Sequence, residues 1–157
     1  MTSGREIART LRAAYLALYR QTNDCFAKDG VTADQFVLLS ALADEDAVTQ
    51  QELVRRVGSD PNTVRAMLLL LEDCGLVARE RHPVDGRARC VTLTGKGRQV
   101  FKRLWTKSEP LQARLLAAFG PDEVIALVGL LRRVAGVMAP RANSGSRTTK
   151  TKRSAGS

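Results

Sequence analysis

The chain has 157 residues, 44% of them hydrophobic, and a formal net charge of +9. This length predicts one folded domain, and an aromatic content of only 4% argues against a sandwich or barrel and favours a mainly helical fold. The basic balance favours nucleic acid over a membrane as the partner. The N-terminus lacks the apolar stretch of a signal peptide, and the longest apolar run, 124–131, is far shorter than the roughly 20 residues that span a bilayer, so we expect a cytoplasmic protein.

The first part of the chain is predicted to form two helices. Apolar residues recur at helical spacing over about residues 5–28, which indicates one long amphipathic helix that ends near Gly30. Thr32 and Gln35 have the spacing of a capping box, in which each side chain accepts a hydrogen bond from the other residue's backbone amide. They predict a second helix, which ends in the acidic stretch "DEDAV".

The next two helices are short and closely spaced. Thr49 and Glu52 predict another capping box, which begins a third helix ending at Gly58. Asp60 then caps a fourth helix, which has a proline at its first position and ends at Gly75. Two short capped helices joined by a tight turn predict a helix-turn-helix.

The fourth helix has one apolar and one mixed face. At about 100° per residue, its core-facing stripe consists of Val64, Met67, Leu68 and Leu71. Asn62, Thr63 and Arg65 point away from this stripe, and their amide, hydroxyl and guanidinium groups are of the kinds that bond base edges or phosphates in a major groove. Leu69 and Leu70 are apolar residues outside the stripe.

A basic hairpin follows. The stretch "LVARERHPVDGRARCVTL" predicts two strands around a Pro-Val-Asp-Gly turn. Its basic side chains outnumber its two acidic ones and are Arg79, Arg81, Arg87 and Arg89, with His82 beside the turn. A slender basic hairpin suits a narrow minor groove, whose negative potential attracts arginine. Together with the preceding helices, it predicts a winged helix-turn-helix over about residues 32–94.

The rest of the chain is predicted to add two helices and a tail. Residues 96–118 have helical apolar spacing, and Pro110 is expected to kink this helix or to remove one of its hydrogen bonds. A last helix is predicted over 121–138. Residues 1–139 are therefore expected to form the single domain, and the basic, apolar-poor residues 140–157 a disordered tail.

Nothing in the sequence indicates an enzyme, a cofactor or a metal site. The three cysteines, Cys25, Cys74 and Cys90, form no CxxC pair, so reduced thiols are expected. Cys74, His82 and Cys90 do not have a usual zinc spacing, and a fourth ligand is missing. His82 is the one histidine, and no nucleophile motif accompanies it.

Two stretches resemble the MarR (multiple antibiotic resistance regulator) family of winged helix-turn-helix transcriptional regulators. They are "LEDCGLV" at the end of the fourth helix and "DGRARCVTLTGKG" from the wing into the next helix. The similarity extends over about residues 5–139 and includes the proline at 110 and the ending "FGPDEVIALVGLLRRV". The resemblance implies a homodimer that binds double-stranded DNA at a pseudo-palindromic operator, as a repressor rather than an activator.

The resemblance also implies roles for particular residues. The expected DNA-binding residues are Thr49, Gln50, Asn62, Thr63, Arg65, Arg81, Asp85, Arg87 and Arg89. Among these, Arg87 would enter the minor groove and Asp85 would orient basic side chains of the wing. The expected dimerisation residues are Ile7, Leu11, Leu18, Leu115, Leu127, Leu130 and Leu131. A small aromatic or phenolic effector is implied, with Tyr15, Tyr19 and Trp105 as candidate lining residues of its cleft.

Two alternatives remain open from the sequence. Leu69 and Leu70 are also consistent with a winged helix that binds another protein instead of DNA. Cys25, in the first helix with the two tyrosines, is a candidate for the redox-sensing branch of the same family.

Overall fold

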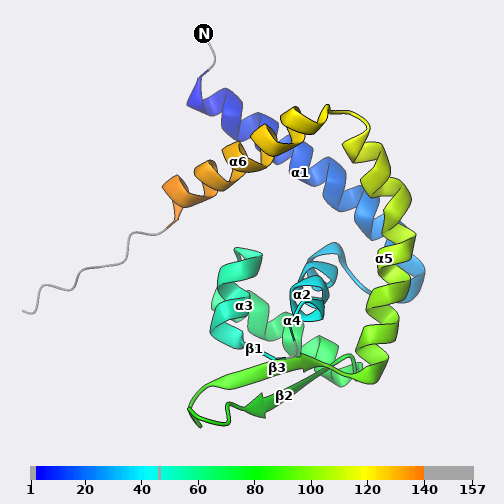
Figure 1. The fold of residues 1–157 in the computed structure, drawn as a ribbon, viewed down its shortest axis with the longest axis vertical. Helices are drawn as coiled ribbons and strands as arrows, with labels where there is room; N and C mark the ends of the chain where they lie inside the picture. Colours follow the sequence, from blue (N-terminus) through cyan, green and yellow to red (C-terminus); the bar gives the residue numbers. More distant parts are fainter. Residues whose placement is uncertain (1–2, 46, 140–157) are drawn as a thin grey trace, which may run out of the picture. The chain divides into compact units, whose positions relative to one another are not determined.

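The computed structural model describes residues 3–45 and 47–139, so the predicted tail at 140–157 lies outside the described residues. Its elements are α1 (Gly4–Phe26), the 3-10 helix η1 (Ala27–Asp29), α2 (Ala33–Ala43), β1 (Val48–Thr49), α3 (Gln50–Val57), α4 (Pro61–Asp73), β2 (Val77–Arg81), β3 (Arg89–Leu93), α5 (Gly95–Leu116) and α6 (Pro121–Met138) (Figure 1). The predicted fold class, mainly helical with a small β wing, is confirmed. The described residues divide into two compact units, with the boundary between Leu115 and Leu116.

The predicted helix caps are confirmed, with one exception. Both bonds of the Thr32–Gln35 capping box are present, at 3.1 and 3.0 Å. Thr49 accepts a hydrogen bond from the backbone amide of Glu52 at 3.1 Å, but the predicted reciprocal bond, from the Thr49 amide to the Glu52 carboxylate, is wrong. That carboxylate instead accepts charge-assisted bonds from Arg55 and Arg56, which are the stronger kind. The hydrogen bonds from Arg55 are the main reason that the pKa of Glu52 falls to about 2.

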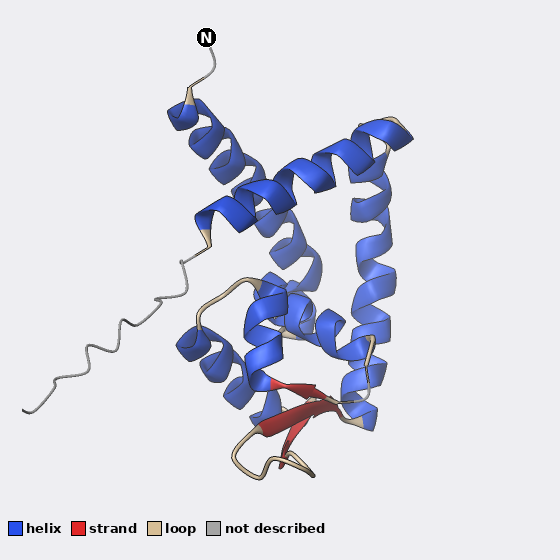
Figure 2. Cartoon of the chain, turned by 60° about the vertical axis from the view of Figure 1, so that its left-hand side comes forward, coloured by secondary structure: helices blue, strands red, loops and turns tan. Residues whose placement is uncertain are grey.

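The sheet has one strand more than the sequence predicted. Its order is β1-β3-β2, and both pairings are antiparallel. Figure 2 shows the strands in red. β2 and β3 form the predicted hairpin, with Val77 opposite Leu93 and Arg81 opposite Arg89. β1 contributes only Val48 and Thr49, which is too short a segment to show strand periodicity in the sequence.

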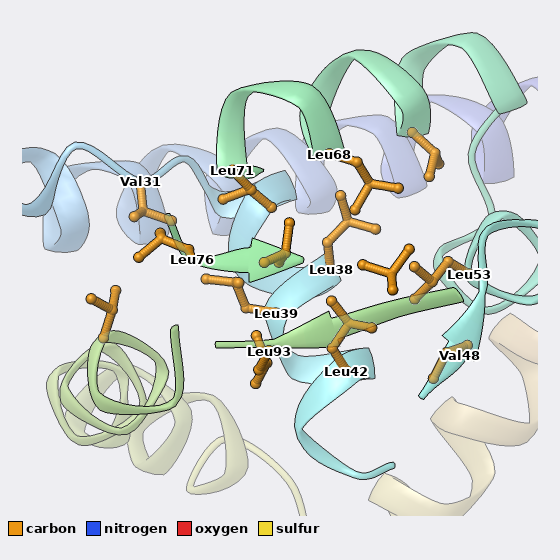
Figure 3. Close-up of a cluster of buried hydrophobic side chains, with 14 of the residues drawn as sticks. Val31, Leu38, Leu39, Leu42, Val48, Leu53, Leu68, Leu71, Leu76 and Leu93 are labelled. Atoms are coloured by element: carbon orange, nitrogen blue, oxygen red, sulfur yellow. The ribbon is translucent and has the colours of Figure 1, made fainter. Parts of the chain in front are cut away.

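One hydrophobic core holds α2, α3 and α4 on the sheet. Figure 3 shows its central side chains, among them Leu38, Leu39, Leu42, Leu53, Leu68, Leu71, Leu76 and Leu93. The predicted stripe of α4 is confirmed, because Val64, Leu68 and Leu71 are buried and Met67 is half-buried against them. The opposite face of α4 is thereby turned to the outside at a fixed angle.

A nearly buried carboxylate ties the end of α1 to α5. Asp29, in η1, has a side chain that is 6% exposed and accepts hydrogen bonds from Lys107 at 2.6 Å and Arg103 at 3.1 Å. The bond from Lys107 is the largest of the effects that lower the pKa of Asp29 below its ordinary value of 3.8. Beside it, the thiol of Cys25 donates to the backbone carbonyl of Lys107 at 3.2 Å.

Replacing Asp29 by Asn should destabilise the fold by about 1 kcal/mol at neutral pH, because the amide keeps the shape of the carboxylate and loses its charge. A carboxylate whose pKa is lowered by folding stabilises the folded state above its unfolded pKa, and this contribution is lost as the pH falls through the folded pKa. Urea unfolding at several pH values should therefore show a difference between wild type and Asp29→Asn that is constant above about pH 5 and shrinks below about pH 4. A difference that persists in acid would contradict this role.

The junction between the wing and α5 is tightly packed around Gly97. The hydroxyl of Thr94 donates to the carbonyl of Gly75 at 2.6 Å and accepts from the amide of Gly97 at 2.9 Å. Lys96 caps the end of α4 by donating to the carbonyl of Cys74 at 2.8 Å. A Cβ atom at position 97 would overlap the carbonyl oxygen of Leu76. The end of α4 is therefore fixed directly to the start of α5, which continues through Pro110 as one helix.

The second unit contains α6. The amide of Gly120 donates to the side chain of Glu123 at 2.8 Å, which begins the helix as the sequence predicted. No residue of α6 is buried, although the helix is largely apolar. Its exposed large side chains are Ile125, Leu127, Val128, Leu130, Leu131, Val137 and Met138. Within residues 3–45 and 47–139, no helix combines the length and the apolar content that a membrane crossing needs.

Candidate nucleic-acid interface

The first turn of α4 is held by Asp60. Its carboxylate accepts hydrogen bonds from the backbone amides of Asn62 and Thr63, at 3.1 and 3.0 Å, and from the Thr63 hydroxyl at 2.5 Å. The hydroxyl bond is the largest of the effects that lower the pKa of Asp60. Because the Thr63 hydroxyl donates to Asp60, it is left as an acceptor towards an external group. The side chains of Asn62 and Arg65 are exposed and have no hydrogen-bond partner within the described part of the chain.

The turn of the wing is built by two side chains that bond its backbone. Nδ1 of His82 accepts hydrogen bonds from the amides of Val84 and Asp85, at 3.2 and 3.0 Å. Oδ1 of Asp85 accepts one from the amide of Arg87 at 3.1 Å. Asp85 thus shapes the backbone that presents Arg87. Sequence reasoning missed the part played by His82, because a histidine before a proline carries no turn signal of this kind.

Two surface depressions gather most of the expected DNA-binding residues. The first, of about 590 Å³, lies between the start of α3 and the wing and is lined by Thr49, Gln50, Gln51, His82, Asp85, Arg87, Ala88 and Arg89. The second, of about 390 Å³, is lined by Gln50, Arg65, Glu72, Arg79 and Arg89. Gln50 and Arg89 belong to both. Asn62, Thr63 and Arg81 line neither, although all three are exposed.

The arginines of the wing are not equivalent. Nε of Arg79 donates to Oε2 of Glu72 at 2.7 Å, so this charge is paired with a carboxylate of α4. Arg81, Arg87 and Arg89 are exposed, and no residue at 3–45 or 47–139 forms an ion pair with any of them. Three unpaired guanidinium groups on the wing favour a polyanionic ligand.

The residues expected at a dimer interface have exposed or half-exposed side chains. Those that are exposed are Ile7, Leu18, Leu115, Leu127, Leu130 and Leu131, and Leu11 is half-buried. On α1, only Phe26 is buried. Each unit therefore presents apolar helix surface that its own core does not cover.

The expected effector-cleft residues belong to two groups. Tyr15 and Tyr19 of α1 have ring centroids 5.7 Å apart, and the Tyr15 hydroxyl donates to Asp34 at 3.4 Å. Burial, followed by the nearby charge of Asp34, raises the pKa of Tyr15. The ring centroid of Trp105 instead lies 6.0 Å from that of Phe101. Phe101 in turn stacks on Phe36, which packs against the hydrophobic core. Cys25, the candidate redox residue, is half-buried and forms no disulfide with another described residue.

Comparison with known proteins identifies the family. The sequence profile described as MarR family matches residues 29–88. MgrA, an HTH-type transcriptional regulator from Staphylococcus aureus, is 32% identical over 113 residues, which cover 72% of this chain and 76% of MgrA. The chain belongs to the MarR family. This is a non-enzymatic family, in agreement with the sequence-based expectation.

A further relative and two solved structures are consistent with this assignment. YdgJ from Bacillus subtilis, an HTH-type transcriptional regulator, is 30% identical over 105 residues; the match covers 67% of this chain and 64% of YdgJ, less than two thirds of that protein. BpsR from Bordetella bronchiseptica, whose DNA binding is regulated by 6-hydroxynicotinic acid, superposes with a TM-score of 0.75 at 29% identity, over 86% of this chain and 96% of BpsR. A mutant MarR from E. coli, complexed with operator DNA, gives 0.73 at 26% identity, over 82% and 92% of the two chains.

Proposed function

We propose that the chain is a transcriptional regulator that binds double-stranded DNA in a sequence-dependent manner. The observation that carries the proposal is the depression that joins the start of α3 to the wing, which brings unpaired Arg87 and Arg89 beside Gln50. The exposed first turn of α4 adds Asn62 and Arg65, whose side chains are also free to bond an external group. α4 would lie in a major groove and Arg87 would enter the flanking minor groove. This function requires the compartment that holds the DNA, which agrees with the expected cytoplasmic location.

The proposed active form is a homodimer. Apolar side chains of α1 and α6 are left exposed in one chain, and a second copy would cover them. A twofold dimer requires a pseudo-palindromic operator with half-sites roughly one turn of DNA, about 34–36 Å, apart. We propose repression as the sign of regulation, residues 1–139 as the folded domain and residues 140–157 as an additional basic segment.

A small aromatic or phenolic effector is the proposed signal. BpsR provides a precedent, because its DNA binding is regulated by 6-hydroxynicotinic acid. Tyr15 and Tyr19 provide a pair of neighbouring rings, one of them hydrogen-bonded to Asp34 at the start of α2. An effector held there would act only if it bound one spacing of the two α4 helices more tightly than the other.

Selection of duplexes from a random pool, followed by mobility-shift titration, tests the proposal. We expect a palindromic consensus and a strong decrease of affinity with salt, because phosphate contacts release counterions. Failure to retain any duplex at low ionic strength would favour the alternative of a protein-interaction module. The exposed Leu69 and Leu70 of α4 are the observation that keeps this alternative open.

Arg87→Ala should weaken binding of the selected duplex about tenfold and lower the slope of log affinity against log salt by about one for each protomer. The guanidinium of Arg87 has no partner in the described part of the chain, so its removal breaks no internal contact. Lys102→Ala removes the same charge from the exposed side of α5 and should leave the affinity close to that of wild type. An unchanged slope for Arg87→Ala would contradict the placement of the wing in a groove.

A further inference from the structure

The smaller depression has features that the general DNA-binding proposal does not explain. It lies where α4 and the two wing strands meet, and all five of its lining side chains are polar or charged. Arg65 comes from α4, Arg79 from β2 and Arg89 from β3. Three guanidinium groups on three separate elements are thus brought to one place by the tertiary fold.

The charges in this depression are only partly compensated. Glu72 pairs with Arg79 through one bond of 2.7 Å, and both side chains are partly buried, at 37% and 22% exposure. Within the described residues, Arg65 and Arg89 have no hydrogen-bond or ion-pair partner. The lining therefore keeps two uncompensated positive charges, which in water repel each other and attract an anion.

The geometry favours a phosphate over a base edge as that anion. Guanidinium groups bind phosphate oxygens through planar, charge-assisted pairs of hydrogen bonds. Arg65 comes from a helix and Arg89 from a strand, and both line one depression, so their guanidinium groups are able to share the oxygens of one phosphate. We propose that this depression seats one backbone phosphate of the DNA, held jointly by Arg65 and Arg89. Arg65 is then a phosphate contact and not a reader of bases.

The inference rests on the proposed function, and its test separates the two. The probes are a duplex selected by the full-length protein and a shuffled duplex of the same composition. Arg65→Gln and Arg89→Gln should each weaken both duplexes by the same factor, about tenfold, and should leave the selected consensus unchanged. Because both residues hold one phosphate, the double variant should lose less than the product of the two single losses.

A methylphosphonate scan locates the phosphate. Replacing phosphates one at a time by neutral methylphosphonate should reveal one position per half-site at which wild type loses about tenfold in affinity. Arg65→Gln and Arg89→Gln should each lose less than wild type at that same position, because one of the two contacts is already absent, and the double variant should lose less than about twofold. Lys102→Gln, which removes a charge from α5, should reproduce the wild-type scan.

Several outcomes would overturn the inference. A changed base preference in Arg65→Gln would make Arg65 a reader of bases. A scan with no position coupled to both arginines would contradict the shared phosphate contact. In either case the protein would still bind DNA, so the proposed function would stand. Competition by inorganic phosphate at constant ionic strength would assign the depression to a free phosphate instead. If wild type bound no duplex, the proposed function would fall together with the inference.

Discussion

Gly97→Ala should destabilise the protein by about 3 kcal/mol, the upper end of the usual cost of overpacking. The added Cβ would overlap the carbonyl oxygen of Leu76, which belongs to the backbone and is not able to swing aside as a side chain does. The same carbonyl accepts the amide of Thr94 at 3.1 Å, so moving it also disturbs the junction of the wing with α5. Urea unfolding followed by circular dichroism measures the loss.

Gly95→Ala provides a matched control for this substitution. Gly95 begins α5, two residues earlier, and a Cβ there would meet no atom within 4 Å. Alanine also has the higher helix propensity, so this variant should be neutral or more stable by up to about 1 kcal/mol. Equal stabilities of the two variants would show that the close approach of Leu76 to residue 97 does not exist in solution.

Placing glutamate at both Leu127 and Leu131 should convert the proposed dimer to a monomer and weaken binding of a palindromic duplex at least about 100-fold. The two residues are four positions apart on α6 and share one exposed apolar face. Four glutamates, two from each protomer, would then be buried in the proposed twofold interface, where a charge without a partner of opposite sign is strongly unfavourable. Sedimentation velocity reports the oligomeric state and mobility shift the loss of avidity.

Arg132→Glu distinguishes a lost interface from a general effect of altered charge. It introduces glutamate into the same helix at a position turned about 140° from Leu127 and about 160° from Leu130, and should leave the proposed dimer intact. Circular dichroism should show that all variants keep their helical content, because α6 has no buried residue whose packing the substitutions disturb. A double variant that remained dimeric would exclude this face of α6 from the interface.

The local features of the fold were predictable because they depend on neighbouring residues. A capping side chain such as Thr32 acts on an amide three residues away, so its effect is readable from the sequence. The stripe of α4 follows from helical periodicity in the same way. β1 was missed because its two residues become a strand only by pairing with β3, about 40 residues later. The second bond of the expected box at Thr49 was wrong because Glu52 had stronger partners in Arg55 and Arg56.

The candidate site shows the same division. The sequence indicated which residue types would face DNA, and the family resemblance pointed to Arg87 and Asp85. The sequence did not show that Arg79 is paired with Glu72, since these residues meet across the turn between α4 and β2. Nor did it show that His82 holds the turn of the wing, because that bond depends on the backbone path around Pro83.

The sequence by itself determined the helices, their caps, the basic wing and membership of a winged-helix class, all of which follow from periodicity, short-range hydrogen bonding and a local motif. Only the tertiary structure decided which charges remain unpaired and which meet in one depression. Arg65 and Arg89 become neighbours because the core packs α4 against the sheet. The two residues are 24 positions apart in the sequence, so no local pattern indicates that they meet. Electrostatic interactions depend on distance in space, and folding sets that distance.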